Sequence, residues 1–178
     1  MGPNSARNHA EYQKRGDSML VSTKGRYALR MMIEIAIRTE NAGERCHVSL
    51  REIAESEDIS PKYLEQLARP LVKEGLLRSV RGQGGGYTLS TPPEDISAGA
   101  ILRAVEGPST TVACLGTDGF DCPRKDRCST LPFWKELDRV VAEYTDSVSL
   151  LDLVKRHHGD TCAGAGTDPS DGKACIFA

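Results

Sequence analysis

The sequence predicts a mainly α-helical fold that carries one small β-hairpin as a wing. Apolar residues recur at spacings of three and four in several segments, and each segment follows a residue type that commonly caps helices. Residues 76–81 and 87–90 have the character of strands, and the glycine-rich stretch between them suits a tight hairpin turn. The order helix, short strand, helix, turn, helix, hairpin is that of a winged helix-turn-helix.

The chain begins with a polar stretch, residues 1–18, which lacks the apolar core of a secretory signal and is expected to be a disordered arm. Ser22 or Thr23 is expected to cap the first helix, whose apolar positions continue to Ile37. Val48 is expected to form a brief strand. No run of eighteen apolar residues is present, so we expect no membrane span and a cytoplasmic protein.

The next two helices have strong start signals. Ser49 is expected to cap a helix over residues 50–57, and Glu52 three residues later completes a capping box. Ser60 is expected to cap a helix over residues 61–74 that starts on a proline, where the missing N–H costs nothing. A glycine follows at the position that commonly ends a helix.

The third helix and the hairpin suit DNA recognition. In a helix-turn-helix, the N-terminal residues of this helix meet base edges in the major groove. Gln pairs with adenine and Glu accepts from cytosine, Lys and Tyr reach phosphate, and an Arg in the wing can enter the minor groove. The alternative is an ordinary solvated helix face. The residues expected to contact double-stranded DNA are Ser60, Lys62, Tyr63, Glu65, Gln66 and Arg81, within a DNA-binding domain over residues 19–93.

The net charge of the chain does not by itself indicate DNA binding. Residues 19–90 contain 11 Lys and Arg against 9 Asp and Glu, and residues 91–178 contain 9 against 14. The DNA-binding half is therefore not strongly basic. Residues 81–86 also match the R-x-x-G-x-G loop by which many acetyltransferases hold a pyrophosphate. Such a loop needs a helix directly after it, and a strand is expected here, so we predict no enzyme.

Three cysteines lie close together in a polar, glycine- and charge-rich stretch that core packing does not explain: Cys114, Cys122 and Cys128. Cysteines in a cytoplasmic chain favour metal or redox chemistry over structural disulfides. The two spacings suit an iron–sulfur cluster better than zinc, whose ligands more often pair two to four residues apart. Zinc, a disulfide switch and free thiols stay open, and so does the fourth ligand, for which the candidates are Asp118, Asp121, Asp126, Cys162 or a residue of a partner subunit.

A short helix is expected over residues 97–105 and a long helix from about residue 130. Apolar residues of the long helix recur at alternating spacings of three and four, a heptad seam that seeks a partner helix. We expect the seam to form a homodimer, within a sensor segment over residues 94–158 that ends near His158. Residues 159–178 are expected to be a disordered tail. The dimerisation residues are Trp134, Leu137, Val141, Tyr144 and Val148, with Leu151 continuing the spacing.

Three motifs, residues 22–30, 59–67 and 80–87, closely resemble the Rrf-two family of bacterial transcription regulators, and the resemblance covers about residues 19–158. It implies a homodimeric winged-helix regulator that senses redox, nitric oxide or iron–sulfur status through a 2Fe–2S or 4Fe–4S cluster and binds a palindromic operator. The positions that match the family are Tyr63, Glu65 and Gln66 in the recognition helix, Arg81 in the wing, and Cys114, Cys122 and Cys128 at the cluster.

The chain departs from the family pattern at the cluster. The first cysteine gap is longer than the usual five intervening residues, and the family histidine three residues after the last cysteine is Leu131 here. The acidic ligand that some members donate from the first helix falls near Gly25 and Arg26. A minority of the family lacks a cluster. The alternative function is therefore a thiol- or zinc-based regulator or scaffold that acts through a protein partner.

Overall fold

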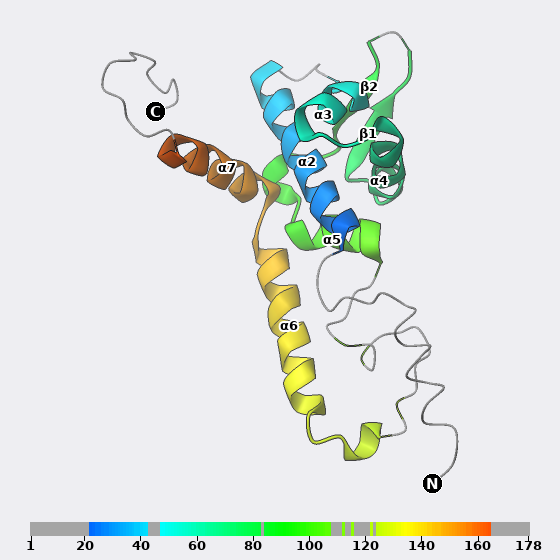
Figure 1. Ribbon diagram of the computed structural model, residues 1–178, viewed down its shortest axis with the longest axis vertical. Coiled ribbons are helices and arrows are strands. Elements are labelled where there is room, and N and C mark those ends of the chain that lie inside the picture. The colour runs from blue at the N-terminus through cyan, green and yellow to red at the C-terminus, as the bar shows by residue number, and fades with distance from the viewer. Residues whose placement is uncertain are drawn as a thin grey trace.

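The computed structural model describes residues 22–42, 47–82, 84–107, 112, 115, 122 and 124–164, with the backbone alone at 41–42 and 159–164. The expected fold class is confirmed, because the described elements are helices and one antiparallel hairpin. Figure 1 shows α6 running away from the group formed by the hairpin and the other helices. In chain order the elements are α2 (Thr23–Ala42), α3 (Leu50–Glu57), α4 (Pro61–Lys73), β1 (Leu77–Val80), β2 (Gly86–Leu89), the 3-10 turn η1 (Pro93–Asp95), α5 (Ala98–Glu106), the 3-10 turn η3 (Lys125–Arg127), α6 (Leu131–Ser147) and α7 (Leu150–Gly164).

Helix α2 lies at the centre of the core. It contacts α3, α4, α5, α7 and β2, and its buried side chains alternate with half-buried ones around the helix. Burial of apolar surface is the main favourable term in folding, so this helix organises the elements around it. The core contains residues from both the predicted DNA-binding part and the part after residue 93: Met31, Met32, Ile35, Ile53, Leu64, Leu67, Leu71, Ile101, Val105, Leu150 and Val154.

The predicted caps of α3 and α4 are present. The Ser49 side chain accepts a hydrogen bond from the Glu52 N–H, and the Glu52 carboxylate accepts from the Ser49 N–H in return. This pairing lowers the pKa of Glu52, because the Ser49 donors stabilise its charged form. The Ser60 hydroxyl accepts from the Tyr63 N–H at 3.3 Å, and α4 starts on Pro61. The starts of α3 and α4 are therefore encoded by short local signals.

The hairpin packs against the segment before α3. Val80 pairs with Gly86 and Leu77 with Leu89 in an antiparallel register. Val48 adds a single bridge to Tyr87, which confirms the brief strand expected there. A Cβ on Gly86 would lie 2.5 Å from the Val48 carbonyl oxygen. Glycine at this position therefore allows the two backbones to approach.

The predicted heptad seam is interrupted, and Val148 is a wrong assignment within it. Val148 is extended, and its carbonyl accepts from the Ala98 N–H at 2.8 Å, while the Leu150 N–H donates to the Ile96 carbonyl at 2.7 Å. These bonds end α6 at Ser147 and bury the Val148 side chain against its own chain, at 7% exposure. Val148 is thus unavailable to a second subunit.

Helix α7 also differs from the expectation. It continues to Gly164, whereas the sequence predicted an end near His158. Residues 159–164 are therefore helical, although they were expected to belong to the tail. Residues 1–18 lie outside the described residues, and the predicted boundary at residue 93 stays a prediction.

Candidate functional site

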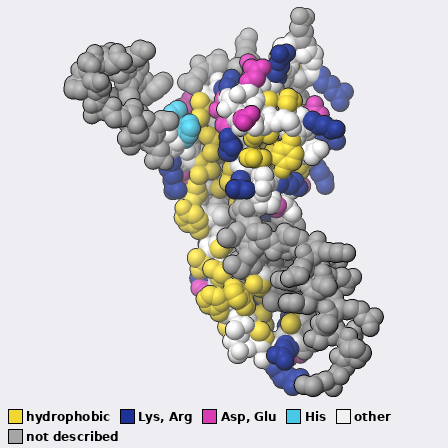
Figure 2. Space-filling view, viewed as in Figure 1, with side chains coloured by type: hydrophobic (Ala, Val, Ile, Leu, Met, Phe, Trp, Pro, Cys, Tyr) yellow, Lys and Arg dark blue, Asp and Glu magenta, His cyan; other side chains and the backbone are white. Residues whose placement is uncertain are grey.

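Helix α4 has a buried face and an exposed face. Leu64, Leu67 and Leu71 are buried in the core, and the exposed residues of the helix after Pro61 are all polar or charged. Lys and Arg side chains gather along the edge formed by α4 and the hairpin (Figure 2). Four residues predicted to contact DNA are exposed on α4 or at its start: Ser60, Lys62, Glu65 and Gln66.

Tyr63 has a packing role that the sequence did not predict. Its ring is half-buried and meets the Tyr27 ring edge to face, with centroids 5.9 Å apart. The Arg30 guanidinium lies 5.6 Å from the Tyr27 centroid and is bonded to Glu57. Packing therefore accounts for the Tyr63 ring, which fixes the start of α4 on α2. Contact between Tyr63 and DNA stays a prediction.

Arg81 is exposed directly after β1, where the hairpin turns. Gly82 and Gly84 in this turn have φ values of +115° and +82°, which L side chains rarely adopt. These glycines allow the chain to reverse within a few residues. As a result, Arg81 lies at the tip of the hairpin, where its side chain is exposed.

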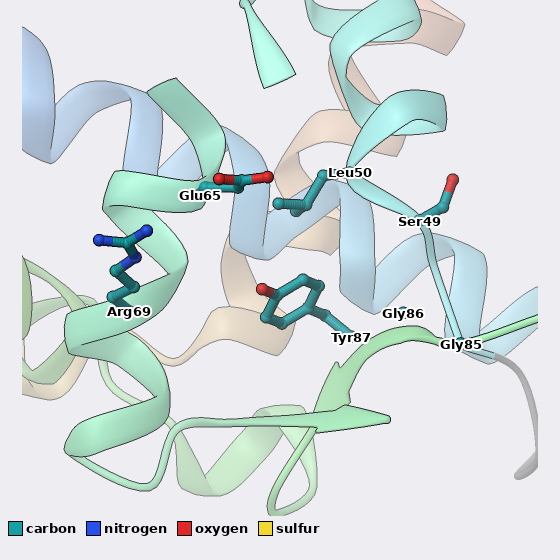
Figure 3. A pocket seen from close by; sticks show the side chains of 7 residues that line it. All are labelled: Ser49, Leu50, Glu65, Arg69, Gly85, Gly86 and Tyr87. Carbon is teal, nitrogen blue, oxygen red and sulfur yellow. The ribbon is translucent and has the colours of Figure 1, made fainter. Parts of the chain in front are cut away.

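A hollow of about 380 Å³ lies between α4, the hairpin and the start of α3. Figure 3 shows Glu65 and Arg69 projecting from α4 and the Tyr87 ring pointing toward α4 from β2. Arg69 was not among the predicted DNA contacts, although its position four residues after Glu65 places it on the same helix face. The seven lining residues are Ser49, Leu50, Glu65, Arg69, Gly85, Gly86 and Tyr87.

The cysteine segment, residues 107–130, connects α5 to α6. Cys122 and Cys128 are half-buried free thiols, while Cys114 lies outside the described residues. The 3-10 turn between them is tied to the first thiol residue, because the Lys125 N–H donates to the Cys122 carbonyl at 3.0 Å. Within the described part of the chain, no three His, Cys, Asp or Glu side chains are grouped to hold a metal. Asp126 is exposed, and neither Asp118 nor Asp121 is described.

Cys128 lies just before the first turn of α6. Its sulfur is 3.3 Å from the Thr130 hydroxyl, and this contact, followed by the Thr130 backbone N–H, lowers the pKa of Cys128. Arg124 lowers it further through its charge. The thiolate is the form of cysteine that ligates metals. The donor chemistry of the described thiols therefore fits a metal or iron–sulfur centre.

Glu106 joins the end of α5 to the start of α2. Its Oε1 accepts from the Ser22 N–H at 3.0 Å, the Ser22 hydroxyl at 2.6 Å and the Gly25 N–H at 2.9 Å. The cysteine segment leaves α5 immediately after this carboxylate. One end of the segment is therefore attached to the helix that organises the DNA-binding core.

An apolar face of α6 is left exposed within the chain. Of the predicted dimerisation residues, Trp134 and Leu137 are half-buried, and Val141 and Tyr144 are 40% and 60% exposed. Phe133 and Val140 belong to the same face, at 61% and 46% exposure, and were missed because they fall outside the strict three-four spacing. Figure 2 shows hydrophobic side chains gathered along α6. None of the described helices is both long and apolar enough to cross a membrane.

Comparisons with known proteins agree with these features. The model of the Rrf2 family, described as "Iron-dependent Transcriptional regulator", matches residues 21–156, from the start of α2 into α7. The HTH-type transcriptional regulator IscR of Serratia proteamaculans is 37% identical over 136 residues, which cover 76% of this chain and 79% of that protein.

Solved structures of transcription regulators are also similar to this chain. T. potens IscR is 34% identical, with a TM-score of 0.63 over 83% of this chain and 93% of that one. CymR, the global cysteine regulator of B. subtilis, is 38% identical, with a TM-score of 0.60 over 77% and 97%. The oxidized form of Staphylococcus aureus CymR is 38% identical, with a TM-score of 0.56 over 76% and 95%.

Proposed function

The chain belongs to the Rrf2 family of DNA-binding transcription regulators, and we propose that it acts as a homodimeric sensor whose cysteines hold an iron–sulfur cluster that controls operator binding. The observation that carries this proposal is the pair of half-buried free thiols, Cys122 and Cys128, beside the start of α6. In chain order they lie between the DNA-reading core and α6, whose apolar face is exposed among the described residues. The family members are transcription regulators, not enzymes.

The DNA-reading surface is the exposed face of α4 together with the hairpin. In the proposed complex, Glu65 and Gln66 meet base edges in the major groove, and Lys62 meets phosphate. Ser60 and Tyr63 lie at the start of α4, where the helix approaches the groove. Arg81 enters the adjacent minor groove from the hairpin.

Dimerisation through α6 follows from its exposed apolar face. Exposed apolar side chains that are contiguous on one helix are typical of an interaction surface. A two-fold dimer presents the same face from both subunits and places two α4 helices for a palindromic operator. The face that we assign to this contact consists of Phe133, Trp134, Leu137, Val140, Val141 and Tyr144.

The proposed ligands are Cys114, Cys122 and Cys128, and the fourth ligand stays open. When bound, a cluster would supply an inorganic centre whose redox state or presence constrains the segment between α5 and α6. Glu106 attaches the first end of that segment to α2, and Thr130 with α6 holds the other end. A constraint on the segment therefore acts on both the DNA-reading core and the dimer helix. Typical couplings of this kind change affinity roughly 5–150-fold.

A second candidate is a sensor that uses the thiols alone or with zinc. One structural relative is described as an oxidized form and another as a global cysteine regulator. Cys128 suits this chemistry as well, because a half-buried cysteine with a lowered pKa reacts readily with oxidants. Such a sensor would need no iron.

Anaerobic purification of the full chain tests the proposal. We expect iron and sulfide in the wild type, visible absorbance that is lost in Cys122→Ser, and unchanged absorbance in Cys46→Ser as the matched control. Operator binding should differ between the form loaded with iron and sulfide and the form stripped of them. Colourless protein with stoichiometric zinc, or identical operator binding by both forms, would reject the cluster sensor in favour of the second candidate.

A further inference from the structure

We infer that Arg69 is a further DNA-binding residue, which grips the phosphate backbone that passes between α4 and the hairpin. This inference rests on the proposed placement of α4 in the major groove and Arg81 in the minor groove. A sugar–phosphate backbone divides those two grooves. The surface that joins α4 to the hairpin must therefore face this backbone.

The hollow described above lies on that joining surface. Arg69 and Glu65 reach it from α4, and Tyr87 and the two glycines border it from the hairpin side (Figure 3). Of its seven lining residues, only Glu65 and Arg69 carry a full charge. Without Arg69, the passing phosphates would meet a net negative surface, since Glu65 repels them. A cation at this position offsets that repulsion.

The guanidinium of Arg69 is available for such a contact. Arg69 is exposed and makes no hydrogen bond or ion pair with any residue that the structure describes. Glu65 precedes it by four residues, an order that favours an ion pair on a helix, yet the two side chains do not pair. Five other arginines are held by carboxylates: Arg30 by Glu57, Arg38 by Glu34, Arg51 by Glu55, Arg103 by Asp146, and Arg139 by Glu136 and Glu143. Arg78 and Arg81 of the hairpin, like Arg69, form no ion pair with any described residue.

Three polar side chains at the hollow could donate a hydrogen bond to a phosphate: Ser49, Tyr87 and Arg69. The Ser49 hydroxyl is engaged with Glu52 in the cap of α3, so it is not free for phosphate. The phenol of Tyr87 points toward α4 from the hairpin side of the hollow (Figure 3). Phosphate accepts several hydrogen bonds at once, and a guanidinium presents five N–H donors in a fixed fork. Arg69 is therefore the principal donor of this contact.

The test measures how DNA affinity depends on salt. Full-length wild type and variants, prepared in the same cysteine and metal state, are titrated against a duplex that the wild type selects from a randomised pool. Each phosphate contact that is lost lowers the slope of log affinity against log salt by about 0.9, hence about 1.8 for a dimer. Between about 50 and 200 mM salt, the affinity advantage of wild type over Arg69→Gln should then shrink about 12-fold.

Two further variants show whether Arg69 contacts a phosphate, reads a base or acts only through the overall charge of the protein. Arg69→Lys keeps the charge and should retain most of the salt slope, because Lys binds phosphate as a point charge. Lys135→Gln removes one positive charge from α6 and should leave the slope unchanged. Sequence preference should be the same in Arg69→Gln and wild type. If Arg69→Lys and Arg69→Gln both relax one base position, Arg69 reads a base and the phosphate assignment is wrong.

Comparing Gln66→Ala with Arg69→Gln tests the Arg69 inference separately from the proposed placement of α4 in the major groove. If Gln66→Ala alters sequence preference while Arg69→Gln keeps the wild-type salt slope, the Arg69 inference fails and the placement of α4 stands. If neither variant changes DNA binding, α4 does not lie in the groove and both fail. Thermal unfolding of each variant shows that it is folded, as expected for substitutions of exposed residues.

Discussion

The Glu106 carboxylate accepts two hydrogen bonds from Ser22, one from its backbone N–H and one from its hydroxyl, across a separation of 84 residues. It accepts a third from the Gly25 N–H in the first turn of α2. Amide hydrogens at a helix start have no partner within the helix, and a negative charge there also interacts favourably with the helix dipole. A single oxygen of α5 therefore holds the start of the central helix.

We predict that Glu106→Gln lowers the free energy of unfolding by about 1 kcal/mol, because the amide keeps the size but loses the charge. Urea denaturation followed by circular dichroism measures this change. Glu94→Gln, which neutralises an exposed carboxylate of η1, should stay within about 0.5 kcal/mol of wild type. Equal midpoints for wild type and Glu106→Gln would show that the three contacts contribute nothing to stability.

The sequence predicted most helix starts correctly because their signals are local. Ser49 with Glu52 and Ser60 with Pro61 lie within a few residues of the helices that they begin, and each is present as a cap in the structure. Val48 was also correctly expected to be a brief strand. Such signals depend on neighbours along the chain and not on the tertiary fold.

The features that the sequence did not reveal depend on contacts between distant segments. Val148 continues the heptad spacing, but pairing with the strand-like residues before α5 makes it a core residue. The partner of Glu106 is 84 residues away and has no sequence signature. Arg69 was overlooked because a charged residue on a helix face is ordinary until the fold places a hollow beside it.

Gly99 allows the end of α6 to approach the start of α5. A Cβ at Gly99 would lie 2.1 Å from an Asp146 oxygen, and Asp146 pairs with Arg103 at 2.8 Å. We predict that Gly99→Ala changes the free energy of unfolding by less than about 1 kcal/mol, because the atoms that its Cβ would meet are the ends of the Asp146 and Arg103 side chains, which are about half exposed and can move. The helix propensity of Ala, about 1 kcal/mol better than that of Gly, offsets the loss of their ion pair.

A double-mutant cycle tests whether Asp146 is the group that Gly99 accommodates. Asp146→Ala alone should cost less than about 1 kcal/mol, since the ion pair with Arg103 is about half exposed. In the Asp146→Ala background, Gly99→Ala should become more favourable by up to about 1 kcal/mol, because there is no ion pair left to disturb. Additive effects of the two substitutions in urea denaturation would show that Asp146 is not the group that Gly99 accommodates.

The apolar face of α6 supplies the last prediction. Val140 is 46% exposed in the single chain, so Val140→Asp should leave the fold intact. In a dimer the new carboxylate would be buried without a partner, which is costly. We therefore expect Val140→Asp to weaken dimerisation at least about tenfold, as measured by sedimentation equilibrium. Ala142→Asp introduces the same group on the opposite face of α6 and should dimerise like wild type. If Val140→Asp stays dimeric at wild-type concentrations, the interface lies elsewhere.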